Sequence, residues 1–347
     1  MVKLLYFSKE EIMMKALMGI GYGNVTGSTM MKSVPVPEPG RGEVLVKVNA
    51  VSINPIDYKI VKGMLKRIKK LPIPYNLGFD LAGVVEKTGP DCVRFKKGDE
   101  VFGRVADRLH DAFAEYALAE EKDLAHKPAQ ITFSEAAAVP LVGLTTIQAL
   151  EELGGLKKGD KIFIHAGSGG IGTFAIQFAK LKGADVTTTT STENVELVKS
   201  LGADRVIDYK HEDYRISADK YDLVYDTLGG DYTKDSLNLL KNGGRMVSIA
   251  GPIDAPTLAK FGLKGLTKWI ALAPRRKLNH KLRIKHLTYN YLYMHPEGNT
   301  LEKIGALMAK GSLKAVIDRT WNFPEISNAI AYVEKGHARG KVIARMS

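Results

Sequence analysis

The spacing of apolar positions predicts a strand, a turn and a helix in the middle of the chain. Residues 161–166 form a short apolar-rich run, typical of a strand buried in a parallel sheet. Gly167, Gly169 and Gly172 then form a G-x-G-x-x-G pattern. Apolar side chains continue at helical spacing, at Ile171, Phe174, Ala175, Phe178, Ala179 and Leu181. Strand, glycine turn and helix in this order are the fingerprint of a dinucleotide-binding unit, whose glycines let the backbone approach a pyrophosphate.

Strand and helix candidates alternate after this unit. Short strands that end near turns are predicted over 185–191, 205–209, 221–226, 245–250 and 289–294. The first of them follows Gly183, a predicted helix C-cap, and a helix is predicted over 193–201. This alternation is typical of a doubly wound parallel sheet.

The first part of the chain has a different pattern, with short strand candidates between glycine and proline turns. The pattern that starts the domain lies at 14–19, and strands are predicted over 43–50, 84–89 and 98–103. This pattern predicts a β-rich domain through about residue 138, preceded by an extension over residues 1–12.

Two helices and two short strands complete the predicted elements. Residues 134–153 have helical periodicity that Pro140 interrupts, and a second helix over 301–310 ends at Gly311. Closing strands are predicted over 315–316 and 341–344.

Composition adds the broad class of protein. A length of 347 residues favours two domains, and 45% apolar with 25% charged residues is typical of an ordinary globular protein. The one cysteine, Cys92, excludes an internal disulfide framework and a cysteine-rich zinc site. Lys9, Glu10 and Glu11 come too early for a signal peptide, and no apolar run approaches the roughly 20 residues of a membrane span. We expect a cytoplasmic protein.

The net charge of +12 is concentrated in two stretches that contain no acidic residue, 58–79 and 255–296. We interpret them chiefly as solvated basic faces. The alternative is that they attract anionic ligands, an acidic membrane or nucleic acid. No nucleic-acid-binding motif accompanies them, so no nucleic-acid partner is expected. Within 260–286, apolar residues interleave with lysines as in an amphipathic helix. We expect this helix to cover the edge of the cofactor domain or a dimer partner rather than a membrane.

Several motifs, spread over nearly the whole chain after residue 13, carry a family resemblance. They are Val34-Pro-Val-Pro-Glu-Pro-Gly40, Asn54-Pro-Ile-Asp-Tyr-Lys59, Gly78-Phe-Asp-Leu-Ala-Gly-Val-Val85, Phe95-Lys-Lys-Gly-Asp-Glu-Val-Phe-Gly103, Ala112-Phe-Ala-Glu-Tyr116, Ala136-Ala-Ala-Val-Pro-Leu141, Leu201-Gly-Ala-Asp-Arg-Val-Ile-Asp-Tyr209 and Gly336-His-Ala-Arg-Gly-Lys341. Together they resemble the zinc-free, quinone-oxidoreductase-like branch of the medium-chain dehydrogenase/reductase superfamily. The Asn-Pro-x-Asp-x-Lys motif most resembles the alkenal/enone oxidoreductases within it.

The resemblance implies an α/β fold with two domains, and usually a homodimer. A β-rich, GroES-like catalytic domain is expected over 1–138, with 297–347 returning to it. A Rossmann cofactor-binding domain with a doubly wound parallel sheet is expected over 139–296.

The same resemblance argues against a catalytic zinc. In the zinc alcohol dehydrogenases a cysteine ligand stands where this chain has Asn54, a histidine falls on Phe79, and a second cysteine falls near Val142. Phenylalanine and valine cannot bind a metal, and none of the eight histidines has zinc-binding spacing with another. We therefore predict no metal site.

Loss of the Lewis acid favours reduction over alcohol oxidation. Hydride addition to a quinone or conjugated C=C places charge on the substrate's own oxygen, where hydrogen-bond donors can stabilise it. We predict an NADPH-dependent reductase of quinones or α,β-unsaturated carbonyls, acting on a small-molecule substrate. The alternatives are an enoyl-thioester reductase, or a cofactor-bound regulatory or RNA-binding protein with little turnover.

The predicted catalytic residues lie in one motif: Lys59, Asn54 and Tyr58. Lys59 resembles the family lysine beside the nicotinamide ribose and substrate, and its alternative is a solvated surface lysine. Asn54 either bonds a substrate carbonyl or caps the turn before Pro55, and Tyr58 either donates a proton or packs.

The predicted cofactor-binding residues are Lys59, Thr145, Gly169, Gly170, Ile171, Ser191, Thr192, Tyr209, Leu228, Ile249 and Arg339. Thr145 resembles the threonine that faces the nicotinamide, and its alternative is a bond to its own helix backbone. Ser191 and Thr192 can donate to a 2′-phosphate, Tyr209 resembles the family's tyrosine contact to it, and Lys210 adds charge. Glu193 argues against a preference for NADPH, since an acid near this position binds the ribose hydroxyls of NAD. The predicted cofactor is NADPH.

Overall fold

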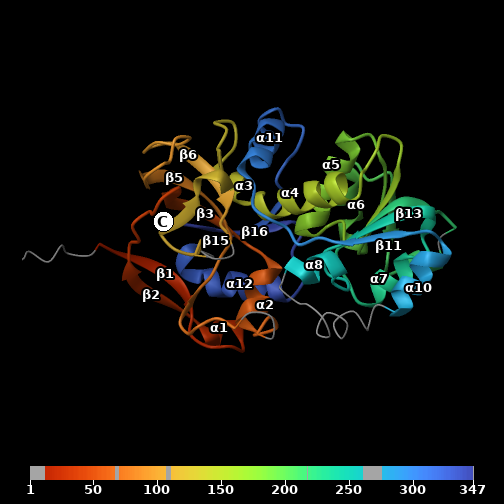
Figure 1. The fold of residues 1–347 in the computed structure, drawn as a ribbon, viewed down its shortest axis with the longest axis horizontal. Coiled ribbons are helices and arrows are strands. Elements are labelled where there is room, and N and C mark those ends of the chain that lie inside the picture. The colour runs from red at the N-terminus through yellow and green to blue at the C-terminus, as the bar shows by residue number, and fades with distance from the viewer. Residues whose placement is uncertain (1–11, 67–69, 107–110, 217, 261–275, 347) are drawn as a thin grey trace, which may run out of the picture.

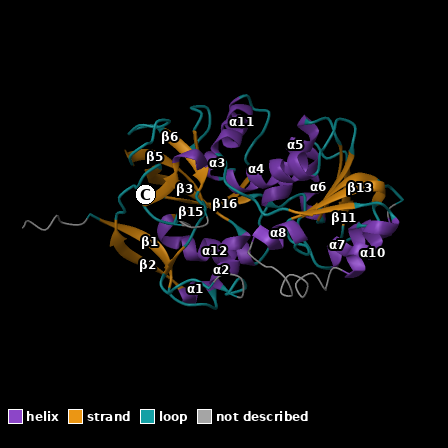
Figure 2. Cartoon of the chain, in the orientation of Figure 1, coloured by secondary structure: helices purple, strands orange, loops and turns teal. Residues whose placement is uncertain are grey.

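The computed structural model describes residues 12–66, 70–106, 111–216, 218–260 and 276–346. Two β-rich bodies lie side by side along the long axis, and a group of helices lies between them (Figures 1 and 2). Each body has an apolar cluster of its own, and a further cluster combines buried residues of both, among them Phe102 and Ile162. The predicted extension over residues 1–12 lies outside this description except for Ile12, and so does most of the amphipathic segment predicted within 260–286.

A seven-stranded sheet combines strands from both ends of the chain. Its order is β15-β16-β3-β5-β6-β8, and β7 also pairs with β3. The strands are β3 (Glu43–Ile53), β5 (Asp80–Thr88), β6 (Glu100–Arg104), β7 (Tyr116–Glu120), β8 (Leu124–His126), β15 (Ile317–Asn322) and β16 (Lys341–Arg345). The pairing of β16 with β3, antiparallel and from Val342–Ile53 to Arg345–Ala50, brings the C-terminal strand into the N-terminal sheet.

A smaller sheet and several helices complete this body. The sheet has the order β2-β1-β4 and contains β1 (Met13–Gly19), β2 (Thr29–Pro35) and β4 (Tyr75–Asn76). The helices are α1 (Val25–Ser28), α2 (Pro55–Val61) and α12 (Ile326–Glu334), with 3₁₀ turns η1 (Glu121–Asp123) and η6 (Phe323–Glu325).

The second body is built on a parallel sheet of six strands, in the order β11-β10-β9-β12-β13-β14. They are β9 (Lys161–Ile164), β10 (Asp185–Thr190), β11 (Arg205–Asp208), β12 (Tyr221–Asp226), β13 (Leu240–Ser248) and β14 (Thr288–Tyr291). The order reverses between β9 and β12, which is where open parallel sheets bind ligands at the carboxyl ends of their strands. The helical elements around it are α5 (Gly170–Leu181), η3 (Thr192–Asn194), α6 (Val195–Ser200), η4 (Tyr214–Ile216), α7 (Asp231–Ser236), α8 (Ala255–Lys260) and α10 (Arg276–Ile284).

The connecting helices follow the proline signal in the sequence. The predicted segment 134–153 divides into α3 (Phe133–Ala137), α4 (Pro140–Ile147) and a π-helical turn, η2 (Gln148–Leu153). Pro140 is the first residue of α4. A proline is well tolerated there, because the backbone N–H that it lacks would have no partner within the helix. Helix α11 (Gly298–Ala309) contacts both α4 and β8, so it lies against both bodies (Figure 1).

The predicted fold class, a GroES-like domain with a Rossmann-like doubly wound sheet, is confirmed. Some predicted boundaries are wrong. The edge strand predicted at 315–316 lies at Ile317–Asn322, the strand predicted over 289–294 ends at Tyr291, and the helix predicted from residue 193 begins with a 3₁₀ turn. No helix among the described residues is long and apolar enough to span a membrane.

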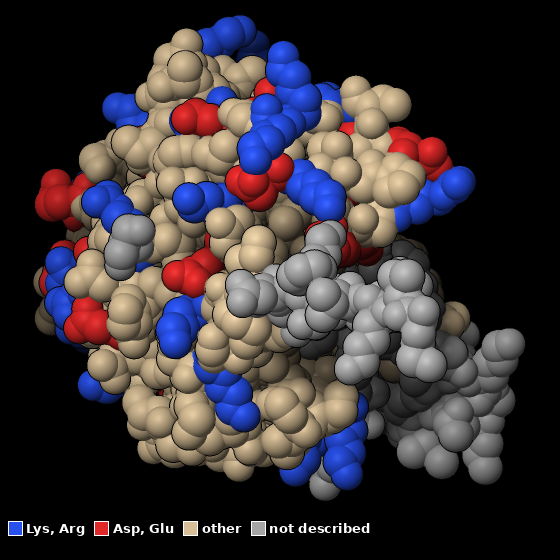
Figure 3. Space-filling view, turned by 90° about the vertical axis from the view of Figure 1, so that its left-hand side faces the viewer, with Lys and Arg blue, Asp and Glu red and all other residues tan. Residues whose placement is uncertain are grey.

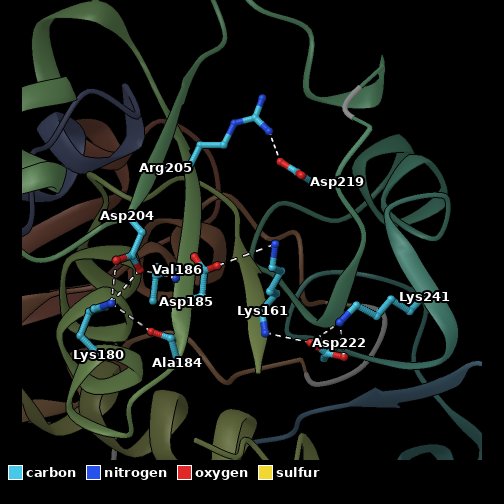
Figure 4. A network of polar contacts seen from close by, with 10 residues as sticks. All are labelled: Lys161, Lys180, Ala184, Asp185, Val186, Asp204, Arg205, Asp219, Asp222 and Lys241. Atoms are coloured by element: carbon cyan, nitrogen blue, oxygen red, sulfur yellow. Dashed lines mark hydrogen bonds and ion pairs between the residues drawn. The ribbon is translucent and has the colours of Figure 1, made fainter. Parts of the chain in front are cut away.

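Ion pairs cover the amino ends of the parallel strands, at the edge opposite the glycine turn (Figure 4). Lys180 binds Asp204 at 2.7 Å and Lys241 binds Asp222 at 2.8 Å, while the Lys161 backbone N–H donates to Asp222. These side chains are substantially exposed, so each pair contributes about 1 kcal/mol or less to stability.

Two glycines of the turn after β9 are required by close packing. A β-carbon on Gly172 would lie 2.3 Å from the Ala166 carbonyl oxygen, and one on Gly167 would lie 2.3 Å from Thr188 Oγ1. Both contacts are shorter than van der Waals contact, and at Gly172 the obstacle is backbone. A side chain there would push α5 away from the sheet.

Gly172→Ala is therefore expected to lower stability by about 1–3 kcal/mol, the usual cost of overpacking. Thermal unfolding followed by circular dichroism measures the shift in Tm. Gly27→Ala is the matched control, because a β-carbon on Gly27 meets nothing within 4 Å and its φ is not positive. Equal melting temperatures for the two variants would contradict this account of the turn.

Candidate active site

The glycine turn presents open backbone at the carboxyl end of β9. Among the described atoms, a β-carbon on Gly169 would meet the Ala166 carbonyl oxygen alone, at 3.3 Å, so the turn is open on the side that Gly169 faces. Gly170 and Ile171 form the first turn of α5, whose N–H groups have no partner within the helix. Open backbone, unpaired donors and the positive end of a helix dipole fit a pyrophosphate.

The end of the chain contacts this turn directly. Gly340 donates its N–H to the Ser168 carbonyl at 2.8 Å, and Gly340 and Gly169 form a parallel β-bridge. Arg339, the predicted cofactor contact that precedes Gly340, is exposed. The structure thus brings Arg339 next to the turn, although 170 residues separate it from Gly169.

A buried carboxylate shapes the next loop along the same edge. Asp226 accepts hydrogen bonds from the backbone N–H groups of Leu228 and Gly229, at 3.1 and 2.9 Å. It also accepts from the hydroxyls of Ser248, at 2.8 Å, and Thr233. This network holds Leu228, 43% exposed, at the carboxyl end of β12, and the half-buried Ile249 follows β13. The sequence analysis did not identify Asp226. Its position as an acidic residue at the end of an apolar strand could have pointed to it.

The end of the edge where the sequence predicts ribose binding contains an ion pair. Lys210 Nζ lies 2.9 and 3.2 Å from the Glu193 carboxylate oxygens. The bond from Lys210 lowers the pKa of Glu193 to about 2 and raises the pKa of Lys210, so both stay charged near neutral pH. Tyr209 is 60% exposed beside this pair.

The two predicted phosphate-binding hydroxyls contact carboxylates in this structure. Hydrogen bonding by Ser191 contributes to the low pKa of Glu193, and Ser191 Oγ also accepts from Asn194 Nδ2 at 3.0 Å. A hydrogen bond from Thr192 is the largest cause of the lowered pKa of Asp208. Both hydroxyls lie at the predicted place but already have acidic partners.

The three predicted catalytic residues lie on or just before α2. Tyr58 is half-buried and packs against the core of the N-terminal body. Lys59 is also half-buried, and its ammonium makes no hydrogen bond or ion pair with any residue that the structure describes. An ammonium in that state is available to a ligand.

Asn54 differs from the other two, because its side-chain amide is already bonded within the protein. Asn54 Oδ1 accepts a hydrogen bond from the Lys341 ammonium, and Nδ2 donates to Asp80 Oδ2 at 2.9 Å and to the Ser52 carbonyl at 3.4 Å. The residue is 1% exposed. These contacts favour a structural role for Asn54 over a direct bond to a substrate.

Thr145 also has an internal partner. Its hydroxyl donates to the Leu141 carbonyl at 2.6 Å, one turn earlier in α4, and the residue is buried. This bond is the alternative that the sequence left open for Thr145.

A second buried carboxylate lies under α2. Asp57 accepts a hydrogen bond from the Asn54 backbone N–H at 2.7 Å, which caps the start of the helix, while its Oδ1 has no hydrogen-bond partner among the described residues. The pKa of Asp57 is raised from 3.8 to about 8, chiefly by burial and also by the nearby charge of Asp80, against the lowering effects of the Asn54 N–H bond, Lys341 and Arg104. Asp57 is therefore largely protonated at neutral pH.

Comparison with known proteins agrees with this geometry. Residues 40–129 match the family model for the alcohol dehydrogenase GroES-like domain, and residues 201–343 match the model for a zinc-binding dehydrogenase. The 2-methylene-furan-3-one reductase of Solanum lycopersicum is 34% identical over 95% of this chain and 78% of its own length. The chain is an oxidoreductase of the medium-chain dehydrogenase/reductase superfamily.

Other members of the superfamily extend the comparison. The chloroplastic NADPH-dependent alkenal/one oxidoreductase of Arabidopsis thaliana is 34% identical over 95% of this chain and 79% of its own length. The structure of the quinone oxidoreductase from Coxiella burnetii has a TM-score of 0.84 and 32% identity, with 97% of this chain and all of that one covered. Relatives named for NADPH and NAD(P)H support a nicotinamide cofactor.

In this medium-chain dehydrogenase/reductase, the three positions that correspond to zinc ligands in zinc-dependent relatives hold different kinds of residue. Asn54 bonds an ammonium, and Phe79 and Val142 are buried apolar residues. The Arg104 guanidinium lies 4.8 Å from the Phe79 ring centroid. Among the described residues no group of three or more His, Cys, Asp or Glu side chains could hold a metal.

The protonation of Asp57 predicts a pH-dependent stability. Its pKa is higher in the folded protein than in the unfolded chain, so its contribution is complete below about pH 4 and is lost as pH rises toward 8. Asp57→Asn cannot ionise, so we expect its Tm relative to the unmodified protein to be higher at pH 8.5 than at pH 5. Asp99→Asn, at a half-buried turn residue that accepts the Lys96 N–H, is the control for general charge effects. A Tm difference that does not change with pH would show that Asp57 is ionised throughout this range.

Proposed function

We propose that this chain is a zinc-independent, NADPH-dependent reductase that transfers hydride to a quinone or to the conjugated C=C of an α,β-unsaturated carbonyl. The observation that carries the proposal is the Lys59 ammonium, which pairs with no described residue and lies on the helix whose start Lys341 joins to the glycine turn. Phe79 and Val142 support it, because neither can ligate a metal.

The chemistry follows from where charge develops. The bound cofactor supplies the hydride, and addition to the acceptor places negative charge on the acceptor's oxygen. The Lys59 ammonium can stabilise that charge or hold the ribose, since no described residue competes for it. Tyr58 supplies a hydroxyl on the same helix. Asn54 contributes by holding the start of α2.

The proposed cofactor site follows the carboxyl edge of the parallel sheet. Gly169, Gly170 and Ile171 would hold the pyrophosphate, Leu228 and Ile249 would flank the rings, and Thr145 and Arg339 would line the approach from the catalytic side. Lys210 and Tyr209 support NADPH over NADH, because a cation and a phenol at the strand tip can bind a 2′-phosphate. Glu193 acts against this preference, since it competes for Lys210 and Ser191.

We further propose the predicted domain division, with the catalytic domain over 1–138 and 297–347 and the cofactor domain over 139–296. A homodimer and a cytoplasmic location are part of the proposal, although some relatives are named as mitochondrial or chloroplastic. Nucleic acid and membrane are not proposed as partners. Acidic and basic side chains are mixed on the face that Figure 3 shows. Two lysines of the basic stretch 58–79 have partners within the protein: Lys62 pairs with Glu334, and Lys66 lies 4.3 Å from the Tyr22 ring centroid.

NADPH consumption measured with an enone, a quinone and an enoyl-CoA tests the reaction, and we expect turnover of the first two to exceed that of the thioester. Chelators should leave the rate unchanged. A rate that chelation abolishes and zinc restores would overturn the zinc-independent chemistry, and selective turnover of the enoyl-CoA would establish the thioester alternative.

Lys59→Ala should lower kcat/KM for the preferred acceptor at least about tenfold, which corresponds to about 1.4 kcal/mol of transition-state stabilisation. Its Tm should change little, because the ammonium has no partner among the described residues. Lys62→Ala is the matched control on the same side of α2, since it loses only a partly exposed ion pair with Glu334. Equal kinetics for both variants would identify Lys59 as a surface lysine.

Glu193→Gln should raise kcat/KM for NADPH by about fivefold, because it frees Lys210 and Ser191 for the 2′-phosphate, and should change kcat/KM for NADH little. Glu196→Gln, at an exposed pair with Lys199 one residue into α6, is the control. A loss confined to NADH would instead mean that Glu193 binds the ribose hydroxyls.

A further inference from the structure

One buried ammonium contacts segments that carry both the proposed cofactor site and the proposed catalytic residues. Lys341, the first residue of β16, is 5% exposed. Its Nζ donates to Asn54 Oδ1, at the residue before α2, and lies 3.6 Å from Asp80 Oδ2, at the start of β5. The side-chain head thus belongs to the catalytic wall.

The aliphatic part and the backbone of the same residue belong to the cofactor side. A β-carbon on Gly170 would lie 2.9 Å from Lys341 Cδ, so the lysine stem covers the glycine turn. The preceding residue, Gly340, donates its N–H to the Ser168 carbonyl at 2.8 Å. One side chain therefore spans from the pyrophosphate turn to the start of the helix that carries Lys59.

Asp80 extends the network to a third segment. It is fully buried and accepts from Ser52 Oγ at 2.8 Å, from Asn54 Nδ2 at 2.9 Å and from the Leu141 backbone N–H at 3.0 Å. Leu141 lies in the first turn of α4, the helix that carries Thr145. Removing the ammonium would leave a buried carboxylate without its cation.

We propose that Lys341 is a positioning residue for hydride transfer, which holds the glycine turn and α2 at the separation that the reaction requires. The inference rests on the proposed function. It assigns no proton or covalent step to Lys341, and its effect is geometric, because hydride transfer needs reacting atoms within about 3–3.5 Å. The alternative is a purely structural role, in which Lys341 only neutralises Asp80.

The two roles differ when both charges are removed together. A buried ion pair can often be replaced by neutral groups without loss of stability, whereas removing one partner is strongly destabilising. Lys341→Met keeps most of the stem over Gly170 but leaves Asp80 unpaired, so its Tm should fall. Lys341→Met with Asp80→Asn buries no unpaired charge, so its Tm should return toward that of the unmodified protein.

The double variant is therefore the decisive test. If Lys341 positions the reacting groups, kcat of the double variant should stay at least about tenfold below that of the unmodified protein. The Kd for NADPH, measured by calorimetric titration without acceptor, should change less than about threefold. The deuterium isotope effect with 4-deuterated NADPH should increase, because hydride transfer becomes more rate-limiting. Recovery of both Tm and kcat, or a loss confined to cofactor affinity, would overturn the proposal.

Asp80→Asn alone supplies a second, independent comparison. It removes the charge partner and leaves the ammonium on Asn54 and the stem on Gly170. Its kcat should exceed that of the double variant by at least about fivefold, and equal values would overturn the proposal. Failure of the unmodified protein to reduce any acceptor would contradict the proposed function, whereas an unimpaired double variant would contradict only the role of Lys341.

Discussion

The pairing of β16 with β3 is the constraint on which the site depends. It brings the last strand of the chain into a sheet whose first strand begins at residue 43, and it leads Gly340 past the glycine turn after β9. The ammonium of Lys341 then meets Asn54, a residue 287 positions away. Without this return of the chain, the cofactor edge and the α2 wall would have no shared contact at this point.

Burial decides which charges have large effects. Asp57 and Lys341 are enclosed, and desolvation is the largest cause of the raised pKa of the first and the lowered pKa of the second. Exposed pairs, such as Glu193 with Lys210 and those at the amino edge of the parallel sheet, are screened by solvent and exchange partners more readily. The chain thus combines a fixed polar network between its two bodies with an adaptable one at the ribose end.

The residues at the zinc-ligand positions of zinc-dependent relatives change the charges around the site as well as the ability to bind a metal. The buried cations of this region, Lys341 and Arg104, are monovalent, and hydrogen bonds or an aromatic face hold them. They do not offer the open coordination position of a catalytic zinc. Such a site suits an acceptor that delocalises charge onto its own oxygen, which is why the local chemistry and the superfamily membership lead to the same class of reaction.

The sequence by itself determined the elements whose signal is local. Periodicity predicted most strands of the parallel sheet, and the glycine spacing predicted the turn that fits a pyrophosphate. The resemblance of the motif that contains Lys59 drew attention to that lysine. Only the tertiary structure decided the internal bonds of Asn54 and Thr145, the protonation of Asp57 and the role of Asp226. The network of Lys341 with Asp80 was also beyond sequence reasoning, because each partner is an ordinary charged residue in its own segment. Burial and proximity give these groups their properties, and both arise from contacts between residues that are distant along the chain.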